Sequence, residues 1–134
     1  MPVVSLPCAD FVSKSVTLGK FDSQSDYAYR YGQCLALAVA LSVFSDDPTV
    51  ALVMDKDGSL SHAAAYDEET ERFFDYDGWW SADEFEENFI TGSKSIEYVS
   101  PADARARETH LDRLPKQNYR VARIFASMLL GSVS

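Results

Sequence analysis

Residues 31–41 read YGQCLALAVAL, and this stretch decides how the rest of the fold is arranged. A glycine, a glutamine and a cysteine come directly before seven apolar residues, Leu35 to Leu41. Because apolar residues face every side of such a helix, the sequence predicts a central, buried helix over residues 34–44. Cys34 would stand at the N-terminus of that helix.

Two interpretations of Cys34 are open at this point. A free cysteine is a small hydrophobe that packs well inside a core. A cysteine at a helix N-terminus can also be stabilised as the thiolate, which is the nucleophilic form. Cys8 is the only other cysteine, so the chain has no disulfide framework. A single Cys8–Cys34 bridge stays open as an alternative, and it would block any chemistry at Cys34.

The composition indicates one globular domain over residues 1–134, with 46% hydrophobic and 13% aromatic residues. The net charge of −9 argues against a nucleic-acid binder and against docking on an anionic membrane. The charge is uneven, because residues 55–87 carry twelve Asp or Glu but only Lys56 and Arg72. This stretch would repel acidic partners and attract basic ones.

The sequence shows no targeting or membrane segment. The start, MPVVSLPCADF, lacks the basic region of a signal peptide. The apolar run LALAVALSVF is far shorter than the ~20 residues that a membrane span needs. We therefore expect a cytoplasmic protein.

Three antiparallel strands are predicted after the buried helix, over residues 49–55, 61–67 and 71–77. Asp57-Gly58 is the hairpin signal between the first two. Helices are predicted near residues 81–90, 101–114 and 115–130, and a further strand over 94–100, whereas residues 1–22 are ambiguous between short edge strands and an irregular arm. The expected fold class is α+β, with the Cys-bearing helix packed on the sheet.

His62 and Asp75 are the partners that thiol chemistry at Cys34 would need. Such chemistry requires a base near the sulfur and a group that holds the base in one tautomer. His62 begins the second predicted strand, next to small residues, whereas the chain's other histidine lies in a charged helical stretch. Asp75 interrupts an apolar run, where an unpaired carboxylate is costly and an imidazole N–H is a suitable partner. Asp77 faces the same side of that strand and is the alternative third member.

The order of these residues resembles that of the papain-like and transglutaminase-like cysteine enzymes. In that superfamily a Cys opens a central helix, a His begins a strand, and an Asp or Asn lies on the following strand. The matching motifs here are G-Q-C-L-A-L-A, S-H-A-A-A-Y and R-F-F-D-Y-D-G, within about residues 31–90. Small bacterial and phage proteins of this fold have a similar pattern. The resemblance implies a papain-like core and a catalytic triad of Cys34, His62 and Asp75.

The resemblance departs from papain-type proteases around the nucleophile. Those enzymes place an oxyanion-hole Gln several residues before the Cys, but that position is Ala28 here, and Leu35 replaces the Trp that follows the Cys. An oxyanion hole would use the backbone N–H of Cys34 and a second donor, for which Gln33 is a candidate.

Trp79 and Trp80 are candidates for lining a substrate groove, although such a pair is more often partly core. A metal site finds little support. The stretch DKDGSL has the glycine and glutamate positions of a calcium loop wrong, and Cys34 and His62 lack the paired spacing of a zinc site. We expect no metal and no cofactor.

Two functions from different classes follow from these observations. The triad predicts a cysteine-dependent acyl-transfer enzyme, a hydrolase of the protease, peptidase, deamidase or isopeptidase type, acting on a protein or peptide substrate that the charge favours as basic. The acidic stretch predicts instead a small binding protein, such as a phage-type antagonist of a basic, nucleic-acid-binding partner, without catalysis.

Overall fold

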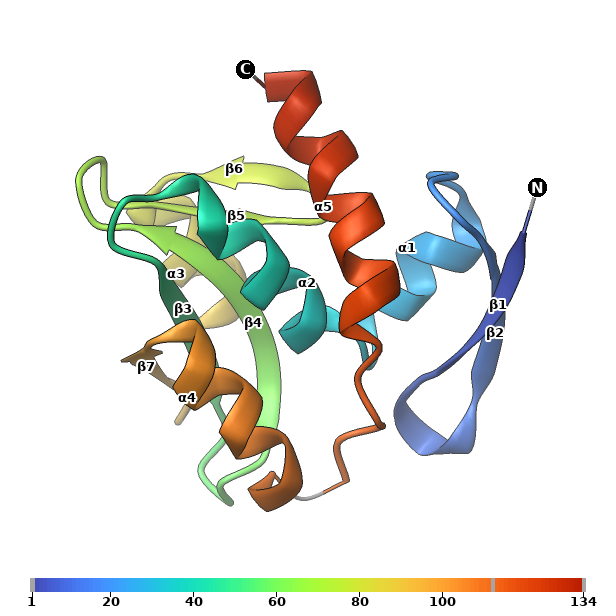
Figure 1. The fold of residues 1–134 in the computed structure, drawn as a ribbon. Coiled ribbons are helices and arrows are strands. Elements are labelled where there is room, and N and C mark those ends of the chain that lie inside the picture. The colour runs from blue at the N-terminus through green and yellow to red at the C-terminus, as the bar shows by residue number, and fades with distance from the viewer. Residues whose placement is uncertain (1, 112, 134) are drawn as a thin grey trace.

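The computed structural model describes residues 2–111 and 113–133 and has an α+β architecture with antiparallel sheets (Figure 1). The larger sheet has five strands in the order β6-β5-β4-β3-β7. Its strands are β3 (Thr49–Met54), β4 (Leu60–Asp67), β5 (Arg72–Asp75), β6 (Gly78–Trp80) and β7 (Ser95–Val99). The predicted α+β class and the antiparallel order of the three central strands are confirmed.

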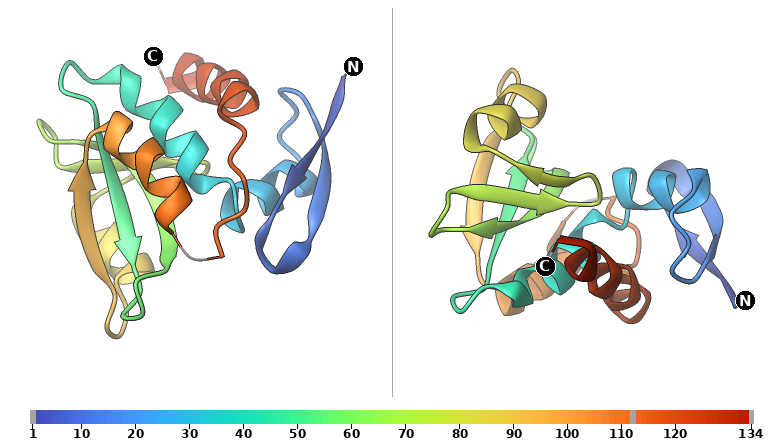
Figure 2. Two further views of the ribbon diagram at one scale, coloured as in Figure 1. Left: turned by 60° about the horizontal axis from the view of Figure 1, so that its bottom comes forward. Right: turned by 90° about the horizontal axis from the view of Figure 1, so that it is seen from above.

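Helix α2 (Cys34–Leu41) lies at the centre of the fold and begins at the cysteine. It packs on β4 on one side and on α5 (Tyr119–Val133) on the other, so it lies between the sheet and α5 (Figure 2). Of its residues only Val39 is not fully buried, as the apolar run predicts. No helix in the described part of the chain combines the length and apolar character that crossing a lipid bilayer requires.

Helix α3 (Ala82–Phe89) covers the opposite face of the sheet. Ser81 and Glu84 form a capping box at its N-terminus, as their spacing indicates. The ring of Phe85 stacks on Phe73 of β5 with 3.9 Å between the ring centroids. Successive residues of β4 therefore face different helices, because side chains alternate along a strand.

The N-terminal third holds elements that the sequence did not resolve. Residues of the ambiguous arm form an antiparallel hairpin of β1 (Val3–Pro7) and β2 (Ser13–Thr17), which stands apart from the larger sheet (Figure 1). Helix α1 (Ser23–Arg30) follows, capped by the side chain of Asp22, and no helix was predicted there.

The predicted helix over residues 101–114 is shorter than expected. It consists of α4 (Pro101–Ala106) and a 3₁₀ turn, Arg107–His110, and residue 112 of the predicted span lies outside the described residues. The regular helix ends where Glu108 turns its carboxylate to the backbone N–H of Gln117, at 2.8 Å, and to the hydroxyl of Tyr119, at 2.9 Å.

Gly32 allows the N-terminal hairpin to touch the start of α2. Its φ angle of +148° is one that side chains with a Cβ rarely adopt. A Cβ at this position would lie 2.7 Å from Cα of Cys8 and 3.1 Å from the backbone N of Ala9. Because backbone atoms form these contacts, they cannot move aside as a flexible side chain would.

We predict that Gly32→Ala destabilises the protein by about 2–4 kcal/mol, through backbone strain and the clash with Cys8. Urea unfolding followed by circular dichroism measures this change. Gly58→Ala is the matched control, because Gly58 also has a positive φ, +87°, but no described residue lies within 4 Å of its added Cβ. An equal loss of stability in Gly32→Ala and Gly58→Ala would contradict the close approach of Gly32 to the backbone of Cys8.

Candidate active site

Cys34 occupies the first residue of α2 and is 6% exposed. It belongs to an apolar cluster with Leu35, Leu52 and Ala63, which lies between α2 and the sheet. Both cysteines are free, so the Cys8–Cys34 bridge is absent. The thiol is therefore unmodified and sits in the first turn of a helix, where the helix dipole favours a negative charge.

His62 lies on β4, at a part of the strand that has a neighbour on one side. Pairing of β4 with β5 covers only Ala65 to Asp67, whereas pairing with β3 runs from Leu60 to Tyr66 and includes His62. The imidazole stacks on the ring of Phe89 with 4.1 Å between centroids and an interplanar angle of 4°. The unpaired edge leaves room for the thiol at the start of α2 to approach the imidazole.

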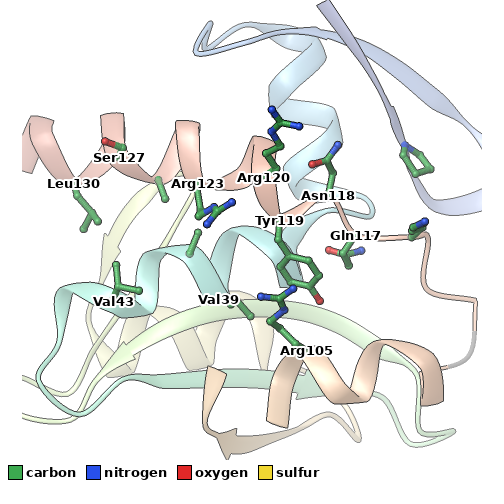
Figure 3. A pocket seen from close by; sticks show the side chains of 14 residues that line it. Val39, Val43, Arg105, Gln117, Asn118, Tyr119, Arg120, Arg123, Ser127 and Leu130 are labelled. Carbon is green, nitrogen blue, oxygen red and sulfur yellow. The ribbon is translucent and has the colours of Figure 1, made fainter. Parts of the chain in front are cut away.

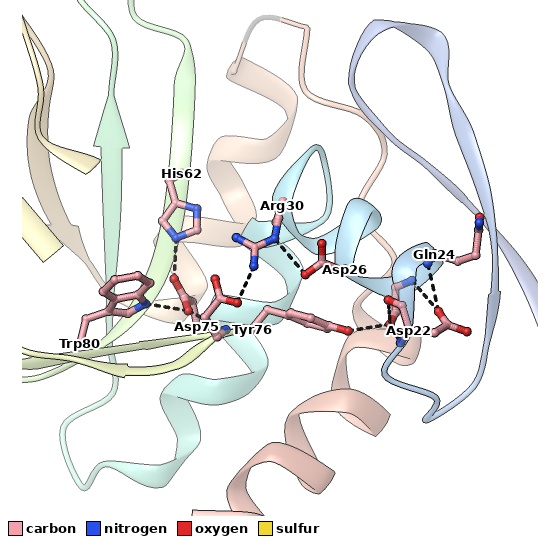
Figure 4. A network of polar contacts seen from close by, with 10 residues as sticks. Asp22, Gln24, Asp26, Arg30, His62, Asp75, Tyr76 and Trp80 are labelled. Atoms are coloured by element: carbon pink, nitrogen blue, oxygen red, sulfur yellow. Dashed lines mark hydrogen bonds and ion pairs between the residues drawn. The ribbon is translucent and has the colours of Figure 1, made fainter. Parts of the chain in front are cut away.

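Asp75 ends β5 and holds His62 through a direct hydrogen bond. The distance from Nε2 of His62 to Oδ2 of Asp75 is 2.9 Å, and both side chains are buried (Figure 4). The other carboxylate oxygen, Oδ1, accepts the indole N–H of Trp80 and the backbone N–H of Asp77, each at 2.9 Å. Three donors therefore fix this carboxylate, which in turn fixes the imidazole ring.

The pKa of His62 is raised from 6.5 to about 9. Burial is the largest influence and lowers the pKa, because desolvation disfavours the imidazolium. Hydrogen bonds to Asp75 and Cys34, with the negative charges of both groups, together outweigh burial. The thiol of Cys34 is thus close enough to the imidazole to influence its pKa. Since Nε2 is engaged by Asp75, Nδ1 is the nitrogen that remains for the thiol.

The structure thus brings together Cys34, His62 and Asp75, the three residues that the sequence put forward as a triad. Asp77, the alternative third member, is not the partner of His62. Its carboxylate accepts a hydrogen bond from the guanidinium of Arg30, which also binds Asp26. This ion pair lies at the turn between β5 and β6 and is half-exposed.

A polar network ties α1 to the strand that carries Asp75 (Figure 4). Besides the Arg30–Asp77 pair, the hydroxyls of Tyr76 and Ser25 are 2.7 Å apart. The rings of Tyr29 and Tyr76 stack with their centroids 5.8 Å apart. Because α1 leads directly into α2, these contacts set the position of the thiol relative to the imidazole.

The side chain of Gln33 makes structural hydrogen bonds, and these do not favour its predicted contribution to an oxyanion hole. Its amide N–H groups donate to the carbonyls of Pro7, at 2.7 Å, and Lys116, at 2.9 Å. Its amide oxygen accepts the backbone N–H of Asn118 at 2.9 Å. Both N–H groups are engaged, which leaves no donor for a substrate oxygen.

The side chain of Gln117 caps the start of α2, and no local sequence pattern indicates this role. Its amide oxygen accepts the backbone N–H of Ala36 at 2.9 Å, and its amide nitrogen donates to the carbonyl of Gly32. The first N–H groups of a helix have no partner within the helix. A side chain 81 residues away in the sequence supplies one here.

The two tryptophans face different sides of the sheet. Trp79 packs on Phe44 and Phe74 beneath the guanidinium of Arg72, so it belongs to the core on the α2 side. Trp80 supports Asp75 through its indole N–H and packs edge-on against Phe89. These contacts give the pair packing and supporting roles, in place of the predicted substrate groove.

No group of three or more His, Cys, Asp or Glu side chains that could hold a metal ion occurs within residues 2–111 and 113–133. Comparison of the chain with protein-family models, with curated proteins and with solved structures gives no match. The geometry of the site therefore carries the functional argument.

We predict that the stabilising effect of His62 falls as the pH rises. Below pH 6.5 both the folded and the unfolded chain keep the proton, so the contribution of the imidazolium is complete. Between pH 6.5 and about 9 only the folded chain keeps it, so stability falls, by at most about 3 kcal/mol.

Urea unfolding between pH 6 and 9.5 measures this effect as the difference between the wild type and His62→Gln. That difference should shrink as the pH rises. His110→Gln is the matched control, because His110 is exposed, and it should leave the pH profile of the wild type unchanged. A pH-independent difference for His62→Gln would show that the imidazole is neutral in the folded protein.

Proposed function

We propose that this protein is a cysteine-dependent acyl-transfer enzyme, a hydrolase built on a papain-like or transglutaminase-like core. One observation carries the proposal: the imidazole of His62 is bound through Nε2 to Asp75 and interacts with the thiol of Cys34. Nucleophilic thiol catalysis needs a base beside the sulfur and a third group that orients the base. The helix N-terminus adds a favourable potential for the thiolate.

In the first half of the reaction, the sulfur of Cys34, as a thiolate paired with the imidazolium of His62, attacks a carbonyl carbon. The tetrahedral intermediate then collapses. The imidazolium gives its proton to the leaving amine as the bond between that amine and the carbonyl breaks, which leaves a thioester on the sulfur. Asp75 keeps Nε2 protonated and directs Nδ1 at the reacting atoms.

In the second half, His62 takes a proton from water, and the hydroxide formed attacks the thioester. The free acid leaves as the thiolate of Cys34 is expelled, and His62 keeps the proton that it took from water, so the starting ion pair is restored. The backbone N–H of Cys34 lies in the first turn of α2 and is a donor for the oxyanion of both intermediates. Proteases, peptidases, deamidases and isopeptidases share this scheme.

The burial of the site favours a narrow substrate. Cys34 and His62 are 6% and 9% exposed, and Phe89 covers one face of the imidazole. A flexible peptide segment or an extended acyl group fits such a site better than a folded protein surface does. The acidic stretch over residues 55–87 further favours a basic peptide. A cytoplasmic location belongs to the same proposal.

We predict that iodoacetamide at about pH 6 modifies Cys34 at least tenfold faster than it modifies cysteine in the urea-unfolded chain, because His62 and the helix N-terminus both favour the thiolate. Mass spectrometry of the labelled peptides measures the rate. His62→Gln should slow the reaction at least tenfold, while His110→Gln should leave it unchanged. Cys34→Ala should abolish the labelling and retain the fold.

A Cys34 that resists alkylation until the protein unfolds would contradict the proposal that this protein is a cysteine-dependent enzyme. The two histidine variants distinguish slow labelling caused by poor access from slow labelling caused by an unreactive thiol. Access of the reagent does not depend on the imidazole, whereas the reactivity of the thiol does. If labelling were equally slow in the wild type and in His62→Gln, the thiol would be a core residue.

A second candidate, an acidic binding protein without catalysis, is favoured by one feature of the surface. A hollow of about 370 Å³ is lined by five carboxylates, those of Asp46, Asp47, Asp67, Glu68 and Glu69. It lies where the segment after α2 meets the β4–β5 turn. A cluster of this charge would attract a lysine- or arginine-rich partner.

For that candidate, we predict that Glu68→Lys with Glu69→Lys weakens binding of a fluorescent oligolysine peptide at least tenfold in low salt, measured by anisotropy. The control is Glu86→Lys with Glu87→Lys on α3, which changes the net charge equally on an exposed surface. An equal loss of affinity for the peptide in the two double variants would indicate attraction by the net charge and would contradict a binding site at the hollow.

A further inference from the structure

An open groove runs between α2 and α5, on the side of α2 away from the sheet (Figure 3). Its volume is about 930 Å³, at the upper end of the range for small-molecule sites in proteins. None of the residues proposed for catalysis lines it. An inference about this groove therefore does not depend on the proposed function.

The groove is apolar at one end. Val43, in the segment that follows α2, and Leu130 of α5 lie at this end, whereas Val39 of α2 lies nearer to Tyr119 and Arg105 (Figure 3). Val43 is 68% exposed, although it lies in an otherwise buried region of the chain. An apolar lining left open in this way is typical of a binding surface.

The other end of the groove is cationic. It is formed by Arg105 of α4, Lys116, and Arg120 and Arg123 in the first turns of α5 (Figure 3). Among the described residues no Asp or Glu lines the groove, although the chain as a whole has a net charge of −9. The N-terminus of α5 lies at the same end, and its dipole adds to the positive potential.

The four cations are available to a ligand. All four side chains are exposed, and none takes part in an ion pair within the described residues. Arg105 lies over the ring of Tyr119, 4.3 Å from its centroid, which fixes one guanidinium at the edge of the groove. The nearby carboxylate of Glu108 is turned to Tyr119 and Gln117 and does not line the groove.

We propose that this groove binds a single-chain anionic amphiphile, a long-chain carboxylate, with its head group at Arg105, Arg120 and Arg123 and its tail between Val43 and Leu130. Charge and apolar character are separated along the groove, as they are along such a ligand. An acidic amphipathic helix is a less suitable ligand, because it would need cations along the whole length of the groove, beside an apolar floor. The apolar end of this groove has no cation among its described lining residues.

The test is titration calorimetry of the full chain with dodecanoate below its micellar concentration. We expect one molecule to bind. Two matched ligands should bind at least tenfold more weakly: dodecyltrimethylammonium, which has the same tail and a cationic head, and hexanoate, which has the same head and a short tail. Equal affinity for dodecanoate and dodecyltrimethylammonium would overturn the anionic head-group site.

Variants locate the two ends of the ligand. Arg123→Gln and Val43→Asp should each weaken dodecanoate binding about tenfold, by loss of a charge-assisted hydrogen bond and by repulsion within the apolar end. Lys116→Gln should weaken it severalfold, whereas Lys56→Gln, the same change in an exposed turn outside the groove, should have no effect. Thermal unfolding by circular dichroism checks that each variant folds.

Three results would overturn the proposal. The first is no binding of dodecanoate to the folded wild type. The second is affinity unchanged in both Arg123→Gln and Val43→Asp. The third is binding of an acidic helical peptide, or of vesicles of anionic phospholipid, without binding of monomeric dodecanoate, since either would assign the groove to a different partner.

Discussion

The start of helix α2 is the constraint on which the rest of the structure depends. A helix that is apolar on every side must be buried, and its first N–H groups then lose their access to water. Gln117 supplies a partner for one of them, at Ala36, while Gln33 holds the neighbouring segments through three hydrogen bonds. Burial of α2 and capping of its N-terminus therefore require the segment around Pro7 and the segment over residues 116–118.

The same constraint places the candidate site. Cys34 is where the helix begins, so whatever fixes the N-terminus of α2 also fixes the thiol. The ion pair of Arg30 with Asp77 and the contact of Tyr76 with Ser25 join the approach to α2 to the strand that holds Asp75. The thiol and the imidazole come from separate parts of the fold, and these polar contacts keep the two parts in register.

Local patterns in the sequence predicted the central elements, because their signals are local. The apolar run predicted α2, and β-branched and apolar content together with the Asp57-Gly58 turn predicted β3 and β4. Asp75 was found because a carboxylate inside an apolar run needs a partner. The role of Gln33 and the capping by Gln117 were not predicted, because each depends on contacts between residues more than 80 positions apart. The early end of α4 was not predicted either, because it depends on hydrogen bonds of Glu108 to Gln117 and Tyr119, which lie beyond the helix.

The capping of α2 from so far along the chain has a consequence for biosynthesis. A nascent chain that has not yet reached Gln117 contains Cys34, His62 and Asp75, but the helix that carries the thiol lacks its partner at Ala36. Contacts at such long sequence separation form late in folding, because the loop between them must close first. The start of α2 is therefore completed late in folding, after the strands that carry His62 and Asp75 have been synthesised.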